Sequence, residues 1–527
     1  MTLATLAPTR AHRVLALVLL AFALVLTAMK SLQIENFQGD TAMFFQATES
    51  VAHRGIPASN LFAQIQVYER AKVFRRTPAE IASDPLVGPP LASDNLLQLH
   101  AYFVLVPLGW IAALVPAPIV LLGAFALAFA GLLYCALALL LAERVPLGVA
   151  LLFGAIVVTH PAFGDSLLYG QFYPDRLFML AGMLLVLAAT RITNRFALAG
   201  AAIFCAATTE RGALVGGIVL LLVTLLSWRS CSDRWFKLLL GVGLVAFSVV
   251  VTHVLLVQGD NGGYFPRNTA TLARLLSPQL LGDTLTFVFV NTVLLGFALF
   301  DRRAALVAVV TMLPNVTGSI GGAEKVGFIT HYHSYYFPIL VWAAALGFAR
   351  AYHLASARTR ARAFTALAAA ALVFAACIDP YAGGPTLSAA RIGQSFIPAF
   401  VSNAETDFSR GGIARSRLGE QLSAAVPVGS RVCAVESAMS FLYRGRTVTF
   451  FPVGVDRAQY VVRPVISAVG GTYVYGGMAS RYGVAAVRRM NLLLTERMRR
   501  DGFDVDHPTV VQGLDLAVIG RVRQEAR

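Results

Sequence analysis

Residues 14–29 read VLALVLLAFALVLTAM, an apolar run that Arg13 precedes and Lys30 follows. A transmembrane helix needs about 20 predominantly apolar residues, with a range of about 17–25. The next residues, Lys-Ser-Leu-Gln at 30–33, contain no small-residue cleavage site. We therefore expect an uncleaved transmembrane helix, and its basic leading flank predicts that the N-terminus lies in the cytoplasm.

The rest of the chain repeats this apolar pattern. Of the 527 residues, 57% are hydrophobic and 13% are charged, whereas soluble domains average about 25% charged residues. We therefore predict an α-helical polytopic membrane protein. The further runs that could cross a bilayer are 97–115, 118–142, 146–160, 176–190, 196–209, 212–228, 238–257, 284–300, 304–320, 334–350 and 363–378.

The net charge of +15 is best explained by topology. Basic residues concentrate in short loops, which the positive-inside rule places in the cytoplasm. These loops carry Arg191 and Arg195; Arg229, Arg234 and Lys237; Arg302 and Arg303; and the cluster 350–362. The charge predicts contact with membrane lipids and does not indicate nucleic-acid binding.

The same alternation places the other connections outside the cytoplasm. They are 30–96, 161–175, the turn near Glu210, 258–283, 321–333 and everything after 379. Residues 96 and 161 then lie on one side, so an even number of crossings separates them, although three apolar runs occupy that stretch. We expect 97–115 to be interfacial, re-entrant or merged with a neighbouring run, which gives about eleven transmembrane helices.

Two domains are predicted. Residues 1–378 form the transmembrane domain, with a long first outer loop at 30–96. Residues 379–527 form a small α/β domain outside the cytoplasm, because strand-like runs at 431–435 and 447–451 alternate with helical stretches such as 485–500.

Ionisable groups gather at the predicted outer ends of the helices, where such groups are functional candidates. Asp40 lies in NFQGDTAMFFQ (36–46), just after the first apolar run. An acid at this position could act as a general base. The other candidates are Glu49, Asp165, Asp175, Arg176, Glu210, Arg211, Lys325, His331 and His333.

Transfer of a sugar from a polyprenyl phosphate suits this set of residues. The acceptor hydroxyl loses a proton as it attacks, so a carboxylate such as Asp40 helps. The leaving phosphate needs positive charge or hydrogen-bond donors. Asp165 and Asp175 could hold a divalent cation such as Mg or Mn, since hard cations prefer oxygen ligands. The candidate phosphate ligands are Arg176, Arg211, Lys325, His331 and His333.

Several of these groups also have a structural explanation. Asp40 before a threonine is a common helix start. Asp175-Arg176 and Glu210-Arg211 are sequence neighbours that can form local ion pairs. His331 and His333 could belong to an aromatic belt at the membrane interface.

The layout resembles a known superfamily. One helix, a long outer loop with an early acid and then many helices resemble the GT-C glycosyltransferases, most closely an uncharacterised bacterial family of polytopic membrane proteins placed among them. That family carries a Phe-Asp-Leu-Gly-Ile-Phe-Asp-Gln-like segment after the first helix. Asp40 and Gln46 match its first Asp and its Gln, and Phe45 stands where its second Asp would be.

Three shorter matches support the resemblance. Residues 172–175 resemble a Phe-His-Pro-Glu-like segment, Glu210 matches a Lys-Glu-Asp-like turn, and residues 331–338 resemble a late histidine-bearing helix start. The resemblance implies a GT-C-like fold, catalysis by Asp40 and a polyprenyl-phosphate sugar donor.

The combined hypothesis is a multi-pass glycosyltransferase of the bacterial cytoplasmic membrane, with its C-terminal domain in the periplasm. It would move a sugar from the lipid donor to a glycan, lipid or protein acceptor on the outer face, with or without a metal ion. Two alternatives stay open at this point: a transporter or flippase of an anionic lipid or glycan, and a non-catalytic membrane scaffold.

Overall fold

The computed structural model describes most of the chain. The described residues are 10–33, 39–61, 77, 79–80, 94–98, 100–192, 194–256, 278–317, 331–355, 358–379, 386–452, 454–465 and 483–522. They form two compact units. Unit 1 comprises Met1–Thr27, Leu97–Val104 and Leu122–Asn403, and unit 2 comprises Ala28–Leu96, Leu105–Leu121 and Ala404–Arg527. Unit 2 thus unites the C-terminal region with parts of the first 121 residues, and the predicted limit at 378/379 stays a prediction.

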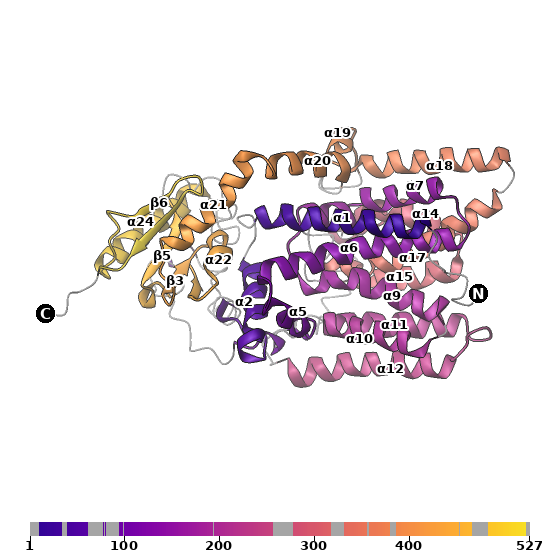
Figure 1. The fold of residues 1–527 in the computed structure, drawn as a ribbon, viewed down its shortest axis with the longest axis horizontal. Coiled ribbons are helices and arrows are strands. Elements are labelled where there is room, and N and C mark those ends of the chain that lie inside the picture. The colour runs from indigo at the N-terminus through magenta and orange to yellow at the C-terminus, as the bar shows by residue number, and fades with distance from the viewer. Residues whose placement is uncertain are drawn as a thin grey trace. The chain divides into compact units, whose positions relative to one another are not determined.

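Unit 1 is helical, and its long helices run side by side (Figure 1). Helices occupy the apolar runs predicted within it, and further helices at 161–168, 390–393 and 396–407 lie outside those runs. They are α1 (Arg10–Leu32), α6 (Ala117–Ala142), α7 (Leu147–Thr159), α8 (Pro161–Leu168), α9 (Phe178–Arg191), α10 (Arg195–Thr208), α11 (Glu210–Leu226), α12 (Arg234–Val250), α14 (Pro278–Ala298), α15 (Arg302–Thr317), α17 (Phe337–Leu354), α18 (Arg358–Cys377), α19 (Ala390–Gly393) and α20 (Phe396–Asp407). Short helical turns are η5 (Pro174–Leu177), η6 (Val251–Leu255) and η7 (His331–Ser334).

Several of these helices are long and apolar enough to cross a bilayer. Among the described residues, four qualify singly: Arg10–Leu32, Ala117–Ala142, Arg234–Leu255 and Phe337–Leu354. The pair α7 and α8 would make a fifth span, bent by 62° at the break before Pro161. Proline lacks an amide hydrogen and disfavours helical backbone in the residue before it, which explains the bend. These spans support a membrane protein, and the count of about eleven stays a prediction.

Helix α17 forms the core of unit 1. It packs against α9, α14 and α15, and its side chains from Phe337 to Ala345 are buried. At Gly347 a Cβ atom would lie 1.8 Å from the Phe297 carbonyl oxygen. A glycine there lets α17 and α14 approach backbone to backbone, as small residues do in membrane helix pairs.

The loops predicted to be cytoplasmic meet at one end of unit 1. Arg191 forms an ion pair with Glu143, and Arg350 Nη2 lies 3.0 Å from Asp301 Oδ2. Lys237 Nζ donates to the carbonyl oxygen of Ala189 at 2.8 Å. The described parts of these loops therefore lie together, as the charge pattern predicts, and we refer to this region as the arginine end.

Unit 2 contains helices and a mixed sheet. The helices are α2 (Gly39–Arg54), α5 (Leu105–Ala112), α21 (Arg410–Ala424), α22 (Glu436–Leu442) and α24 (Val484–Arg500). The strands are β3 (Arg431–Ala434), β4 (Thr447–Phe450), β5 (Tyr460–Pro464), β6 (Thr509–Val511) and β7 (Leu516–Gly520), in the order β4-β3-β5-β7-β6. Strand β3 is parallel to β4 and to β5, and the β5–β7 and β6–β7 pairs are antiparallel. The predicted strands at 431–435 and 447–451 and the helix at 485–500 are confirmed.

Helix α5 (Leu105–Ala112) tests the expectation that an even number of transmembrane crossings separates residues 96 and 161. It is the helix of the run 97–115 and has eight residues, so it is about 12 Å long and too short to cross a hydrocarbon core of about 30 Å. It packs on α2, because a Cβ atom at Gly109 would lie 2.4 Å from the Cβ atom of Val51. The structure therefore agrees with the expectation that this run is no ordinary crossing.

Candidate functional site

In unit 2, two carboxylates approach each other at the start of α2. Asp40 lies in the first turn of this helix. The backbone N–H of Gly39 donates to Glu436 Oε1 at 3.3 Å, across 397 positions of sequence. Glu436 is the first residue of α22 and follows the carboxyl end of β3, two residues after Ala434. The sheet therefore brings a second acid beside Asp40, and we refer to the two as the carboxylate pair.

The environment of the pair favours a proton on Glu436. Burial of this side chain and the negative charge of Asp40 raise the pKa of Glu436 to about 7, against the smaller opposing effect of the hydrogen bond from Gly39. An ordinary glutamate has a pKa of about 4.3. At neutral pH, Glu436 therefore holds a proton much more readily than an ordinary glutamate does. Asp40 lies at a helix N-terminus, where the helix dipole favours a negative charge.

Gln46 joins helix α2 by hydrogen bonds to the segment 59–61 and to Tyr443. Its Nε2 atom donates to Asn60 Oδ1 at 2.5 Å and to the carbonyl oxygen of Tyr443 at 3.4 Å. Its Oε1 atom accepts from Ser59 Oγ at 2.7 Å and from the amide of Leu61 at 3.4 Å. Because both ends of the amide are engaged, Gln46 holds the segment 59–61 and the end of α22 against α2.

Glu49 and Phe45 also join α2 to α22. Tyr443 donates its hydroxyl to Glu49 Oε1 at 3.3 Å, and Arg444 Nε lies 3.6 Å from the same oxygen. Phe45 is fully buried, with its ring centroid 5.6 Å from that of Tyr443. The position where the related family has its second acid is therefore a packing position in this chain, and the second carboxylate comes from Glu436.

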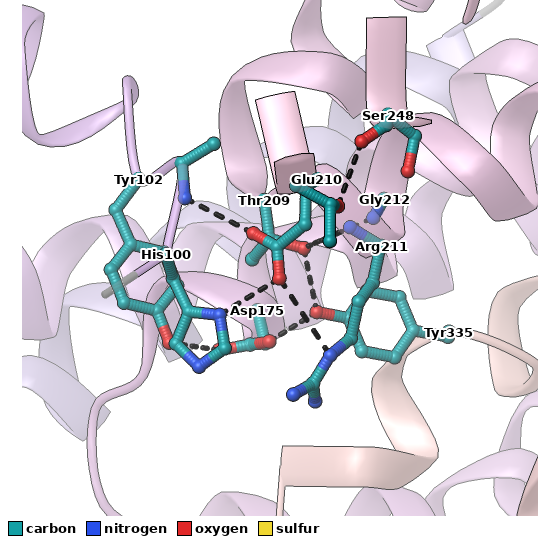
Figure 2. A network of polar contacts seen from close by, with 11 residues as sticks. His100, Tyr102, Asp175, Thr209, Glu210, Arg211, Gly212, Ser248 and Tyr335 are labelled. Carbon is teal, nitrogen blue, oxygen red and sulfur yellow. Dashed lines mark hydrogen bonds and ion pairs between the residues drawn. The ribbon is translucent and has the colours of Figure 1, made fainter. Parts of the chain in front are cut away.

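In unit 1, a polar cluster joins residues that are distant in sequence, among them Asp175 and Glu210 from connections predicted to lie outside (Figure 2). Asp175 accepts hydrogen bonds from the hydroxyl groups of Tyr102, at 3.2 Å, and of Tyr335. Tyr335 Oη also lies 2.9 Å from Thr209 Oγ1. Thr209 is the N-cap of α11, because its Oγ1 atom accepts from the amides of Arg211 and Gly212. We refer to this network as the tyrosine–carboxylate cluster.

Glu210 extends the cluster. Its Oε1 atom lies 2.8 Å from His100 Nδ1, and its Oε2 atom accepts from the amide of Ala101 at 3.0 Å. Arg211 Nε is 3.8 Å from Glu210 Oε1, and the Arg211 guanidinium lies 5.8 Å from the centre of the Tyr332 ring. The predicted pairing of Glu210 with Arg211 is present, and His100 is its closer partner.

The two predicted histidines lie beside this cluster. The His331 ring stacks on Tyr173, with 4.2 Å between centroids and 23° between planes. Burial is the main cause that lowers the pKa of His331, to about 4, so its ring is neutral at pH 7. His333 is buried, with its Nδ1 atom 3.1 Å from Tyr336 Oη. A neutral His331 can offer a hydrogen bond to a phosphate but supplies no positive charge.

Three other predicted residues have structural partners. Arg391 Nη2 donates to both oxygens of Asp165, at 2.6 and 2.5 Å, and both side chains are buried. Arg176 is buried and donates to the Ser166 carbonyl oxygen at 2.8 Å. At Gly170 a Cβ atom would lie 2.4 Å from Arg176 Nη2. Asp165 and Arg176 therefore help to fix the connections around α8 and η5.

The carboxylates predicted to bind a metal ion, Asp165 and Asp175, already have other hydrogen-bond partners. The oxygens of Asp165 face a guanidinium, and those of Asp175 face two phenols. Within the described part of the chain, no three His, Cys, Asp or Glu side chains form a metal-ligating group. In this arrangement Asp165 and Asp175 do not fit the predicted divalent cation. Lys325, the remaining predicted phosphate ligand, lies outside the described residues.

Sequence reasoning missed Glu436, His100 and Tyr335. Its position in the sequence could have marked Glu436 as a candidate. An acid that follows a buried strand lies at the edge where parallel sheets commonly bind ligands. The sequence positions of His100 and Tyr335, just before apolar helices, indicate a functional role less strongly. Their partners come from distant loops, 110 and 160 residues away.

A family described as "Predicted membrane protein (DUF2079)" matches residues 28–464. The chain belongs to this family. The matched region includes both members of the carboxylate pair and the whole tyrosine–carboxylate cluster. No curated protein matches the chain.

Proposed function

We propose that this DUF2079 protein is a membrane glycosyltransferase of the GT-C type. In this proposal it moves a sugar from a polyprenyl-phosphate donor to a glycan, lipid or protein acceptor on the outer face of the cytoplasmic membrane. The carboxylate pair carries the proposal: Asp40 begins α2 just after the first apolar helix, and Glu436 lies beside it with a raised pKa. Two acids whose environments differ in this way are a recurring arrangement of proton-transfer sites.

The proposed reaction is a single displacement at the anomeric carbon. The acceptor oxygen forms a bond to that carbon while the bond from the carbon to the donor phosphate oxygen breaks. The acceptor proton passes to the Asp40 carboxylate, and polyprenyl phosphate leaves with the bonding electron pair. A positioned general base typically contributes about 10²–10⁴-fold to such a rate.

Glu436 supports Asp40 through its own proton. When Glu436 is protonated, one negative charge remains on the pair, and Asp40 can hold that charge as the base. When Glu436 is ionised, two negative charges lie close together, and each disfavours the other. In the proposed site Glu436 thus controls how readily Asp40 accepts a proton.

The donor phosphate needs its own ligands. The assignment of Arg176, Arg211, Lys325, His331 and His333 to this role remains part of the proposal. Of the four that are described, Arg211 suits it best, because its side chain is 20% exposed and carries a charge. Arg176 is fully buried against backbone, and His331 is neutral.

The test is transfer by the purified protein in lipid nanodiscs. Polyprenyl-phosphate-linked pentoses and hexoses with a radiolabelled sugar serve as donors, and cell-envelope glycans and lipids serve as acceptors. We expect release of polyprenyl phosphate together with a labelled product, and we expect Asp40→Asn to slow transfer at least about 100-fold. The matched control is Asp94→Asn, which removes an exposed ion pair with Arg54 in the same unit.

Two results would contradict the proposal. One is full transfer activity in Asp40→Asn. The other is movement of the intact lipid-linked sugar across a vesicle membrane with no release of lipid phosphate, which would identify a flippase.

A further inference from the structure

A cavity of about 410 Å³ opens at the arginine end of unit 1. Four of its lining residues are charged, two arginines and two acids, and they come from four stretches of the chain that are distant in sequence. The lining residues are Glu143, Thr190, Arg191, Asp301, Leu346 and Arg350. The proposed glycosyl transfer assigns no role to them, and the cavity is described entirely within unit 1.

The charges of the cavity are arranged as two ion pairs. Arg191 pairs with Glu143, and Arg350 pairs with Asp301. The Arg350 side chain is 60% exposed and that of Arg191 is 32% exposed. The arginines are thus the more accessible members of the two pairs, since the Glu143 side chain is 27% exposed and that of Asp301 is 8% exposed.

The balance of charge favours a ligand that carries both signs. A purely anionic ligand would meet the carboxylates of Glu143 and Asp301, and a purely cationic ligand would meet the two guanidinium groups. A zwitterion can place its anion on Arg191 and Arg350 and its ammonium on the carboxylates, since charge-assisted hydrogen bonds of this kind are strong. Thr190 adds an acceptor, because its hydroxyl donates to the Val186 carbonyl oxygen and keeps its lone pairs.

The surroundings of the cavity indicate a lipid source. Leu346 lines it from α17, and the side chains of Leu299 and Phe300, just before Asp301, are 65% and 50% exposed. Apolar helices thus end at a charged cavity beside uncovered apolar side chains. Exposed apolar side chains next to a charged cavity suit the boundary of a bilayer, where acyl chains meet headgroups.

We propose that this cavity binds the headgroup of a zwitterionic glycerophospholipid that carries a phosphate and a primary ammonium. The phosphate lies between Arg191 and Arg350, and the ammonium donates to Glu143 and Asp301. A quaternary ammonium has no N–H group and cannot make the second set of bonds. The site thus distinguishes the lipid by its ammonium as well as by its phosphate.

The experiment measures binding to the full-length protein in detergent. Dihexanoyl phosphatidylethanolamine is added, and its dissociation constant is taken from the concentration dependence of the melting temperature. We expect saturable stabilisation, with binding weakened about tenfold or more in Arg350→Gln, which removes a charge-assisted contact. The matched control is Arg302→Gln, because Arg302 is exposed near the same loops but does not line the cavity.

Three comparison ligands make the outcome decisive. Equal stabilisation by dihexanoyl phosphatidylglycerol or by the phosphatidylcholine analogue would overturn recognition of the ammonium. Free phosphoethanolamine that binds as tightly as the lipid would overturn the lipid source in favour of a soluble zwitterion. No saturable shift with any of them, or equal weakening in Arg302→Gln, would overturn the site. None of these results depends on glycosyl transfer.

Discussion

The carboxylate pair of unit 2 and the tyrosine–carboxylate cluster of unit 1 both place two acids near helix starts. The two sites differ in the number of hydrogen-bond donors that surround these acids. In the cluster, donors surround the carboxylates: two phenols for Asp175, and a histidine and an amide for Glu210. In the pair, Glu436 receives a long hydrogen bond from a backbone amide and faces the charge of Asp40.

This difference separates acids that hold the fold from acids that can exchange protons. A carboxylate that accepts hydrogen bonds from several donors fixes the loops that supply those donors. A carboxylate beside another carboxylate gains and loses a proton near neutral pH. We therefore expect substitutions of the cluster's acids and their donors to change stability, and substitutions in the pair to change chemistry.

The largest change in stability is expected at Asp165. Asp165→Asn leaves the Arg391 guanidinium buried without a counter-charge, since the two side chains are only 5% and 8% exposed. Breaking such a buried pair from one side costs about 3–5 kcal/mol. Chemical denaturation in detergent measures the loss. Asp94→Asn, which breaks an exposed pair, should cost about 0–1 kcal/mol; equal losses would refute the distinction between buried and exposed pairs.

A smaller effect is expected from the titration of Glu436. Its pKa is about 7 in the folded protein and about 4.3 in an unfolded chain. Between these values the folded state binds more protons, so stability falls as pH rises from about 4 to about 7 and is unaffected at lower pH. The full effect is at most about 4 kcal/mol, and partial exposure of the side chain reduces it.

Glu436→Gln isolates this effect. Glutamine keeps the shape of the protonated acid and cannot ionise, so the decline of the melting temperature between pH 4.5 and pH 7.5 should become shallower. A decline of unchanged slope in Glu436→Gln would mean that Glu436 keeps an ordinary pKa.

Much of the fold could be predicted from the sequence, because it depends on the residue types within short stretches of chain. Long apolar runs specify helices, and the basic loops that the alternation assigns to one side do meet, as Arg191 with Glu143 and Arg350 with Asp301. The bend at Pro161 and the strand at 431–434 also follow from nearby residues.

The candidate sites were less predictable, because they depend on tertiary contacts. Asp40 could be singled out from its position, but nothing near it in sequence indicates Glu436. Asp165 looked like a metal ligand until its partner Arg391, 226 residues away, was known. Phe45 looked like a lost acid, although its buried contact with Tyr443 explains it as a packing residue.

Tyr335→Phe tests the cluster at a single hydroxyl group. The variant keeps the ring and removes the hydrogen bonds to Asp175 and Thr209. An unsatisfied buried acceptor costs about 1–3 kcal/mol, and denaturation should show a loss in that range. Tyr352→Phe is the matched control, in a part of α17 remote from the cluster. A stability change in Tyr335→Phe no larger than in the control would show that Asp175 does not depend on this donor.

The smallest effect concerns the coupling inside the pair. Because the charge of Asp40 helps to raise the pKa of Glu436, Asp40→Asn should lower that pKa while burial keeps it above 4.5. Infrared difference spectroscopy of the protonated-carboxyl band can follow the titration, with Glu436→Gln to assign it. An unchanged midpoint in Asp40→Asn would show that the two groups do not interact.

The most direct test of Asp40 as the base is rescue of transfer in Asp40→Ala by a small carboxylate. Transfer from a polyprenyl-phosphate sugar would be measured in nanodiscs with sodium formate and with sodium chloride at equal ionic strength. We predict that Asp40→Ala is at least about 100-fold slower than the unaltered protein in chloride and partly recovers in formate, which does not accelerate the unaltered protein. Unimpaired transfer by Asp40→Ala in chloride, or equal acceleration of both proteins by formate, would contradict the assignment of Asp40.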